Sequence, residues 1–537
     1  MKILLALIGH LLLSLISFGQ VTLTKSNLPI VIINTNGQFI DDEPKIMADM
    51  KIIYNGPNVE NSVLDNANEY NGKIGIETRG STSQMFPKLP FGLETLDING
   101  TETDVRILGM PKESDWILNP TYNDKSLMRD GLAYILAGSI MEYSPRVRFT
   151  ELVINQQYQG IYLLQEKIKR NKNRVNIEKM SPQDNASDAL TGGYIIKLDK
   201  ETGTNSGQGW NSIYKPFPNA WQSTFFQYEY PKPAIITGAQ KTYIKQFFDN
   251  FEAILDGPNF ANPQNGFRKY IDTTSLINYI IINELAKNPD AYRLSTFMYK
   301  DRDSKGGKLK FGPVWDFNLG FGNVDYCTQG NPEGLVIEDF NDVCGQDGWV
   351  IHFWWQKFLK DETFYYQLKQ NWHTLRQKQL SNDRILYVID SISTLLNQAQ
   401  KRNFTQWPIL GHYVWPNYFI GATYDSEVSF LKNWILNRLA YLDKVWDIKT
   451  MVTNSKDKFC TIFPNPSTNI VNLNFKQKID SLLNIDVMDH CGNILELGQK
   501  IKSENSIELD MSSITAGVYY LKMEFLGSTY TYSLVKI

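Results

Sequence analysis

The feature that most constrains the fold of this chain is the order in which its hydrophobic periodicities change. Two-residue alternation and β-branched runs fill residues 24–100, whereas residues 349–446 form long blocks with the spacing of amphipathic helices. From residue 460 the pattern returns to short alternating strands that turn residues interrupt. Strands first, helices later and a second strand-rich stretch at the end predict an α+β fold followed by a small all-β sandwich.

The first part of the chain predicts a small β-rich lobe. Strand runs at 28–34 and 50–54 precede an apolar helix at 124–140, whose first residue, an aspartate, would be its N-cap. A hairpin follows at 148–164. These elements place the lobe at about 24–168.

The second part predicts a helical lobe at about 271–446, which begins with an apolar helix that Pro289 ends. Residues 182–270 are rich in Gly, Asn and aromatic residues and only weakly periodic, so we expect an insertion there. A polar linker at 447–459 separates the helical lobe from the predicted sandwich at 460–537.

Residues 1–19 have the parts of a secretory signal peptide: one lysine, a short apolar run and small residues before the expected cleavage after Gly19. The alternative is a membrane anchor, but the apolar run is shorter than the roughly 20 residues that cross a bilayer. No later stretch is long and apolar enough to do so. We therefore expect a secreted or cell-surface protein whose mature chain has no transmembrane segment.

The chain has four cysteines, and an even number in an exported protein favours two disulfide bridges. Cys327 and Cys344 lie in one polar, Gly-rich segment and are the first candidate pair. Cys460 and Cys491 would form the second bridge. Buried free thiols are the alternative.

Composition excludes several functions. Lys+Arg 54 against Asp+Glu 57 gives a net charge of −3, which argues against a nucleic-acid binder that relies on bulk positive charge. The five histidines include no H-E-x-x-H pair, and no G-x-S-x-G elbow accompanies them. If the chain is an enzyme, carboxylates are expected to do the chemistry.

Two aspartates stand at the ends of predicted elements. Asp290 follows the buried helix, and Asp316 follows a strand inside a turn-rich loop, so both could lie at the same edge of one cleft. One could orient a hydroxyl while the other binds Mg²⁺. The alternative, which spacing alone favours, is that each caps a turn beside Pro and Gly.

A candidate phosphate-binding segment lies earlier in the chain. Residues 79–84 precede Lys88, with strands on both sides, and a lysine held between strands is a plausible point charge for a phosphate. The alternative is an edge-strand lysine that faces water.

Five segments follow one another in a particular order: Arg79-Gly-Ser-Thr-Ser with Phe86-Pro-Lys88, Asn123-Asp-Lys-Ser-Leu-Met-Arg129, Val153-Ile-Asn155 with Gly160-Ile-Tyr-Leu-Leu-Gln-Glu166, Asn288-Pro-Asp290, and Trp315-Asp-Phe-Asn318. Over about residues 27–446 this order resembles the spore-coat protein H (CotH) kinase family. The resemblance implies an atypical two-lobe protein-kinase-like fold. It also implies transfer of the ATP γ-phosphoryl group to a protein hydroxyl with Mg²⁺.

The resemblance assigns roles to individual residues. Lys88 would contact the phosphates, and Glu166 would lie at the hinge near the adenine. Asp290 would orient the acceptor hydroxyl, and Asp316 would bind Mg²⁺. Such catalysis needs positioning and charge neutralisation, which these groups can supply without histidine.

The sequence also departs from the usual kinase pattern. It has no G-x-G-x-x-G loop, and the segment that begins with Arg79 would replace it. Ser295 stands where ordinary kinases have a metal-binding Asn, and Asn318 would supply the missing ligand oxygen. The predicted helix at 124–140 offers Asp124 and Asp130 but no glutamate to pair with Lys88.

The end of the chain resembles the sorting domain of the type IX secretion system of Bacteroidetes. The residues that carry this resemblance are Phe463-Pro-Asn-Pro466, the turn at 489–492, Ala516-Gly-Val-Tyr519 and Ser533-Leu-Val-Lys-Ile537. It implies that the type IX secretion machinery is a partner and that the chain crosses the outer membrane.

Three functions are therefore open. The first is a secreted kinase with a protein substrate, ATP and Mg²⁺. The second is a catalytically weak or inactive kinase-like scaffold that serves as a surface binding or structural protein, which the 13% aromatic content and the 182–270 segment favour. The third is another group transferase that uses the same cleft.

Overall fold

The computed structural model describes residues 21–200, 207–447, 459–476, 478–479, 483–489, 493–525 and 528–537. The chain forms two compact units, one of Met1–Lys360 with Asn371–Trp446 and the other of Asp361–Gln370 with Asp447–Ile537. The predicted signal peptide, most of the predicted linker and Cys491 lie outside the described residues.

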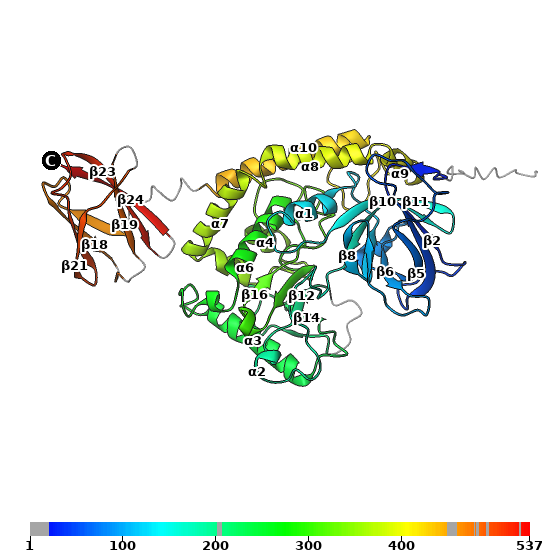
Figure 1. Ribbon diagram of the computed structural model, residues 1–537, viewed down its shortest axis with the longest axis horizontal. Helices are drawn as coiled ribbons and strands as arrows, with labels where there is room; N and C mark the ends of the chain where they lie inside the picture. The colour runs from blue at the N-terminus through cyan, green and yellow to red at the C-terminus, as the bar shows by residue number, and fades with distance from the viewer. Residues whose placement is uncertain are drawn as a thin grey trace, which may run out of the picture. The chain divides into compact units, whose positions relative to one another are not determined.

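The first unit begins with a closed seven-stranded barrel in the order β10-β11-β9-β6-β5-β3-β2 (Figure 1). All neighbours are antiparallel except β10 and β2, which pair in parallel and close the barrel. Alternating apolar residues fill its interior, among them Met50, Ile76 and Trp116, which are fully buried. The strands are β2 (Ile30–Asn34), β3 (Ile46–Ile53), β5 (Tyr70–Thr78), β6 (Phe91–Leu96), β9 (Asp115–Asn119), β10 (Val147–Ile154) and β11 (Gln157–Glu166).

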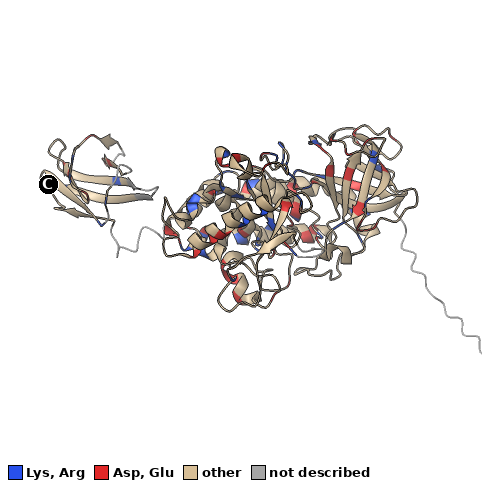
Figure 2. Cartoon of the chain, turned by 90° about the horizontal axis from the view of Figure 1, so that it is seen from below, with Lys and Arg blue, Asp and Glu red and all other residues tan. Residues whose placement is uncertain are grey.

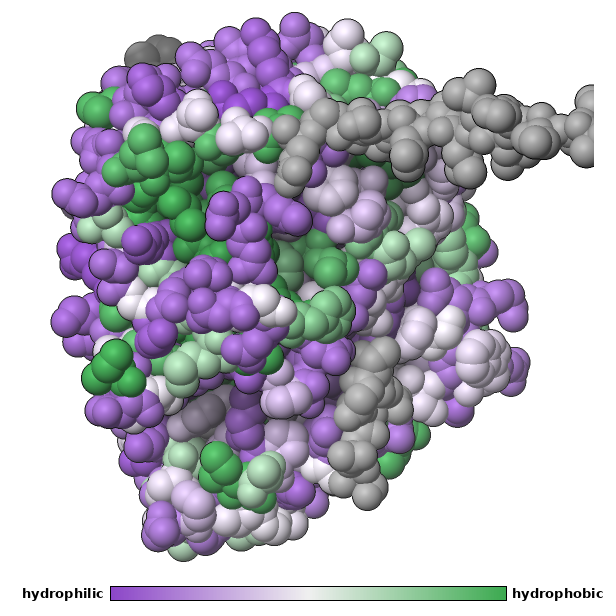
Figure 3. Space-filling view, turned by 90° about the vertical axis from the view of Figure 1, so that its right-hand side faces the viewer, coloured by the Kyte–Doolittle hydropathy of each residue, from purple (hydrophilic) through white to green (hydrophobic). Residues whose placement is uncertain are grey.

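Two strand pairs accompany the barrel, β1 (Lys25–Ser26) with β4 (Asn61–Ser62) and β7 (Val105–Ile107) with β8 (Met110–Glu113). A short 3₁₀ helix, Thr82–Met85, follows β5. On the surface of this end of the molecule, hydrophilic side chains separate several hydrophobic patches (Figure 3).

Helix α1 (Arg129–Ala137) connects the barrel to the rest of the unit and is shorter than the helix predicted at 124–140. Leu127 has a left-handed backbone (φ 62°), which a helix cannot contain, so the helix starts after it. Asp124 still satisfies the first turn, because its carboxylate accepts from the backbone N–H of Arg129 at 2.7 Å.

A second sheet has the order β13-β14-β12-β15-β16. Its strands are β12 (Tyr194–Leu198), β13 (Gly209–Asn211), β14 (Phe225–Tyr230), β15 (Thr296–Lys300) and β16 (Leu309–Phe311). The predicted insertion at 182–270 thus supplies three of the five strands and also contains α2 (Ser187–Leu190) and α3 (Gly238–Asp256). Thr237 and Gln240 form a capping box at the start of α3.

Helix α4 (Thr273–Ala286) begins at an N-cap aspartate, Asp272, and ends where Lys287 adopts a left-handed conformation two residues before Pro289. The later helices are α5 (Val336–Cys344), α6 (Trp354–Leu359), α7 (Glu362–Arg376), α8 (Asn382–Leu396), α9 (Ala399–Gln406) and α10 (Tyr424–Val445). In the described part of the chain, no helix is long and apolar enough to span a membrane. Basic and acidic residues are interspersed over the described part of the first unit (Figure 2).

The C-terminal stretch is all-β, as predicted. One sheet has the order β17-β18-β22-β21 and the other β20-β19-β23-β24. The strands are β17 (Cys460–Phe463), β18 (Ile470–Phe475), β19 (Asn484–Met488), β20 (Ile494–Leu495), β21 (Gly498–Ser503), β22 (Ser506–Asp510), β23 (Gly517–Phe525) and β24 (Ser528–Lys536). Cys460 is buried and forms no disulfide with a described residue, so its predicted bridge to Cys491 stays a prediction.

Candidate active site

A cleft of about 660 Å³ is lined by residues of the barrel and of the second sheet. The barrel supplies the loop after β5 and the facing parts of β9 and β11, and the second sheet supplies the end of β12. Two further loops, after α4 and after β16, complete the cleft. Among the lining residues are Arg79, Thr82, Ile117, Gln165, Asp199, Lys200, Asp290, Asp316, Asn318, Tyr326 and Trp349.

Asp290 lies in the turn after α4, directly after Pro289, and lines the cleft. Its side chain is 17% exposed, and Oδ1 accepts a hydrogen bond from Arg293 Nη2 at 2.8 Å. Burial raises the pKa of Asp290, and the nearby guanidinium of Arg293 opposes that shift. The ion pair with Arg293 therefore offsets part of the effect of burial on this carboxylate.

Asp316 lies in the loop after β16 with a left-handed backbone (φ 63°). Its carbonyl oxygen accepts from Asn288 Nδ2 at 3.0 Å, which connects the loop to the turn that carries Asp290. Burial, then the carboxylates of Asp130 and Asp290, raise the pKa of Asp316 well above its usual range. The two predicted aspartates thus share one cleft and interact electrostatically.

Two side chains of helix α1 accept hydrogen bonds from the backbone of this loop. Asp130 Oδ1 accepts from the backbone N–H of Phe317 at 2.6 Å, and the Tyr134 hydroxyl accepts from the backbone N–H of Asp316 at 3.1 Å. Asn318 donates from Nδ2 to Asn123 Oδ1 at 3.1 Å, so Oδ1 is the atom that Asn318 can offer to a cation.

Four cationic side chains line the same cleft, namely Arg79, Lys197, Lys200 and Arg293. The Arg79 guanidinium lies 5.8 Å from the centre of the Trp315 ring, and burial lowers its pKa while Asp316 opposes the shift. Lys200 Nζ donates to Thr82 Oγ1 at 2.6 Å. Arg79 was predicted, whereas Lys200 and its neighbour Asp199 follow β12 in the weakly periodic segment, where no motif marks them.

Lys88 does not lie among the described residues that line this cleft. It is 1% exposed, and Nζ donates to the Ile161 carbonyl at 2.6 Å and to Asn403 Oδ1 at 2.9 Å. Burial lowers its pKa well below the usual range. Lys88 lies in the bend between the 3₁₀ helix and β6, and its side chain connects the barrel to α9 through Asn403.

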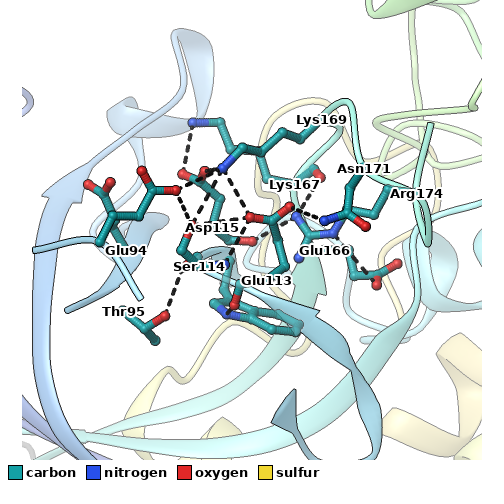
Figure 4. A network of polar contacts seen from close by, with 12 residues as sticks. Glu94, Thr95, Glu113, Ser114, Asp115, Glu166, Lys167, Lys169, Asn171 and Arg174 are labelled. Carbon is teal, nitrogen blue, oxygen red and sulfur yellow. Dashed lines mark hydrogen bonds and ion pairs between the residues drawn. The ribbon is translucent and has the colours of Figure 1, made fainter. Parts of the chain in front are cut away.

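Glu166, expected near an adenine, is not among the described residues that line the cleft and belongs to a polar network instead (Figure 4). Its carboxylate pairs with Arg146 at 3.0 Å and accepts from the Tyr143 hydroxyl at 3.1 Å. Successive residues of a strand face opposite sides, so Gln165 lines the cleft in its place. Gln165 is 2% exposed, and its buried Oε1 has no hydrogen-bond partner in the described structure.

The same network includes the one group of three acidic residues in the described chain whose oxygens are close enough to share a metal ion. Lys169 already occupies that position, because Nζ lies 3.0 Å from Glu113 and 2.7 Å from Asp115 (Figure 4). The same Nζ also lies 3.0 Å from Glu102. The group is therefore an ion-pair network.

The predicted disulfide between Cys327 and Cys344 is present and lies beside the cleft. Tyr326 immediately precedes the first cysteine, and Asp347 and Trp349 follow the second; all three line the cleft.

The fold and site define a mixed α/β protein that has a cleft lined by carboxylates and cations and a C-terminal all-β region. Residues 76–442 match the family of CotH kinase proteins, and the chain belongs to that family. Residues 461–537 match the secretion system C-terminal sorting domain, which indicates export by type IX secretion to the cell surface or extracellular space. No curated protein matches the chain.

Proposed function

We propose that this chain is an exported kinase that transfers the γ-phosphoryl group of ATP to a protein hydroxyl. The observation that carries the proposal is the meeting of Asp290 and Asp316 in one cleft with Arg79 and Lys200. Two carboxylates with different partners and two cations are the groups that phosphoryl transfer requires, since it depends on positioning and charge neutralisation.

The cleft has an end suited to a nucleobase. Ile117 supplies an apolar wall, and next to it lies the unpaired Oε1 of Gln165. A buried amide oxygen without a partner is costly, and the exocyclic amino group of adenine would satisfy it. The triphosphate would extend toward Arg79, Lys200 and the Thr82 hydroxyl.

The acidic side of the cleft suits a divalent cation. Asp130, Asp199 and Asp290 all add negative potential at Asp316, so a cation there would relieve repulsion among these carboxylates. The Asp316 carboxylate and Asn318 Oδ1 are oxygen ligands of the kind that Mg²⁺ prefers, and they would hold it. When bound, Mg²⁺ supplies charge neutralisation at the phosphates.

Asp290 would orient the acceptor hydroxyl and accept its proton at a carboxylate oxygen. Its Oδ1 is held by Arg293, and its partial exposure leaves room for an acceptor group. The acceptor would be a protein that the kinase meets after or during export through the type IX machinery.

A second function, a surface binding protein on an inactive kinase-like scaffold, is favoured by one observation. The family resemblance places Lys88 at the phosphates, but its ammonium group donates hydrogen bonds to the Ile161 carbonyl and Asn403 inside the fold. If Lys200 does not replace it, the cleft would bind a ligand without catalysing transfer.

Calorimetric titration of the full chain with ATP and Mg²⁺ tests the nucleotide site. We expect the wild type to bind and Asp316→Asn to bind at least about tenfold more weakly, which corresponds to about 1.4 kcal/mol. The exposed Asp42→Asn is the matched control and should bind like the wild type. A folded wild type that does not bind ATP with Mg²⁺ would reject the site. Binding without any phosphoryl transfer would favour the scaffold.

A further inference from the structure

Arg293 connects two parts of the chain that meet at the cleft. Its side chain is 3% exposed, and Nε donates to the Pro289 carbonyl at 2.8 Å while Nη2 donates to Asp290 Oδ1 at 2.8 Å. On its other side, Nη1 donates to the Trp349 carbonyl at 2.9 Å and lies 3.4 Å from Asp347 Oδ1. One guanidinium thus holds both the turn with Asp290 and the segment after Cys344.

Helix α5 completes the surroundings of this guanidinium. The Arg293 guanidinium carbon lies 4.4 Å from the centre of the Phe340 ring, which α5 carries. The backbone N–H groups of Val336 and Ile337, at the start of α5, donate to the buried Glu284 carboxylate at 3.0 and 2.9 Å. The last residue of α5 is Cys344, which the disulfide joins to Cys327.

The disulfide therefore fixes the end of the element that supports Arg293. Asp347 and Trp349 leave α5 three and five residues beyond Cys344, so the bridge restricts where both partners of Nη1 can lie. Glu284 fixes the start of α5 independently, so opening the bridge would loosen the segment at its Cys344 end. Gln222 Nε2, which donates to the Gly345 and Asp347 carbonyls at 2.9 and 2.7 Å, would still hold that end in part.

We propose that Arg293 is a positioning residue that fixes the carboxylate of Asp290, and that the Cys327–Cys344 disulfide holds the segment on which Arg293 depends. This inference rests on the proposed function. It implies that full activity follows oxidation in the compartment that the exported chain enters. Closing the bridge joins the two Sγ atoms and releases two protons and two electrons, and a protein disulfide oxidant takes them up and becomes a dithiol.

The test separates nucleotide binding from turnover in the full chain. ATP with Mg²⁺ is the probe; its affinity is measured by calorimetry, and transfer of labelled γ-phosphate to protein or to water is measured under single-turnover conditions. Arg293→Gln should keep ATP affinity within about threefold and lose about 100-fold in rate, because a misplaced catalytic group has an effect of this size. Arg293→Lys retains the charge and should recover part of the rate, which a purely structural role would not predict.

Two further variants address the disulfide and the controls. Cys327→Ser with Cys344→Ser should lower the rate by about tenfold while leaving ATP affinity unchanged, and dithiothreitol should no longer affect this variant. Arg384→Gln, an exposed arginine on α8, should behave like the wild type.

The outcomes distinguish this inference from the proposed function. A wild type that neither binds nor turns over ATP would remove the proposed function itself. An active wild type whose rate is unchanged in Arg293→Gln would overturn the inference alone. If Arg293→Gln does not fold, Asp347→Asn and the double serine variant replace it, and wild-type rates in both would overturn the inference.

Discussion

At the scale of single residues, Gln165 and Glu166 show that a shift of one position along a strand moves a side chain from the cleft to the opposite side of the strand. The sequence identified the right stretch of β11 but could not say which side of the strand would face the cleft. Alternation places Gln165 in the cleft, while Glu166 pairs with Arg146 on the opposite side. Pairing partners that lie 20 residues away along the chain decide this, and no local pattern reveals them.

Gln165→Leu should affect stability and binding in opposite directions. It removes a buried oxygen that has no partner, so the free energy of unfolding should stay equal or rise. It also removes the proposed contact to the base, so ATP affinity should fall by about tenfold. Thermal unfolding and calorimetry measure the two effects, with the exposed Gln157→Leu on the same strand as control. Unchanged ATP affinity would remove Gln165 from the nucleotide site.

Lys88→Met should lower stability without affecting the nucleotide. The Ile161 carbonyl and Asn403 Oδ1 would lose a buried donor, which should lower the free energy of unfolding by about 1–3 kcal/mol. ATP affinity should stay within about twofold, since Lys88 does not line the described cleft. The exposed Lys51→Met in β3 is the control. A folded Lys88→Met that no longer binds ATP would return Lys88 to the phosphate site.

At the scale of elements, hydrophobic periodicity predicted most of the longer helices and strands. The hairpin at 148–164 became β10 and β11, and the strands beside the Asp316 loop became β15 and β16. The helix at 124–140 was predicted to start five residues too early, because the left-handed Leu127 depends on buried contacts of Asp124 with Ser126 and Arg129. Residues 182–270 looked irregular because short strands such as β13 carry too few residues to show a period.

The packing of α3 against β14 includes a buried histidine that should make stability depend on pH. His352 Nε2 lies 2.8 Å from Glu252 Oε1, and Nδ1 lies 2.8 Å from Thr224 Oγ1. Burial lowers the pKa of His352 below its usual 6.5, although Glu252 opposes the shift. Below pH 6.5 the unfolded chain therefore takes up a proton that the folded chain does not. The free energy of unfolding consequently decreases as the pH is lowered.

Urea unfolding of the wild type and His352→Gln at pH 7.5 and 5.5 measures this effect. The stability of the wild type should fall more steeply, by up to about 1.4 kcal/mol per pH unit. Tryptophan fluorescence reports on the first unit, because residues 447–537 contain no tryptophan. His373→Gln, an exposed histidine, should keep the wild-type slope. Equal slopes in wild type and His352→Gln would contradict the assignment.

At the scale of the whole molecule, export and nucleotide binding should be separable. Every described residue that lines the cleft lies between Arg79 and Trp415, whereas the sorting domain occupies residues 461–537. Deleting 461–537 should therefore keep the protein inside the cell envelope and leave ATP affinity unchanged. Cell fractionation and calorimetry measure both. Release of the truncated chain outside the cell would show that another segment directs export.

Family membership and the sandwich could be predicted from sequence because their motifs are continuous. The cleft could be predicted only in part, since Asp199, Lys200 and Arg293 acquire their importance from contacts between distant segments. Asp290 and Asp316 were predicted because each follows a strongly apolar element that fixes its position.

The measurement that tests the central claim most directly is transfer of labelled γ-phosphate from ATP by the full chain with Mg²⁺, to protein or to water. We predict turnover by the wild type and a loss of about 10²–10⁴-fold in Asp290→Asn, with ATP affinity retained, because Asp290 would accept the proton of the acceptor. Equal turnover by wild type and Asp290→Asn, or no turnover by a wild type that binds ATP, would contradict the proposed kinase mechanism.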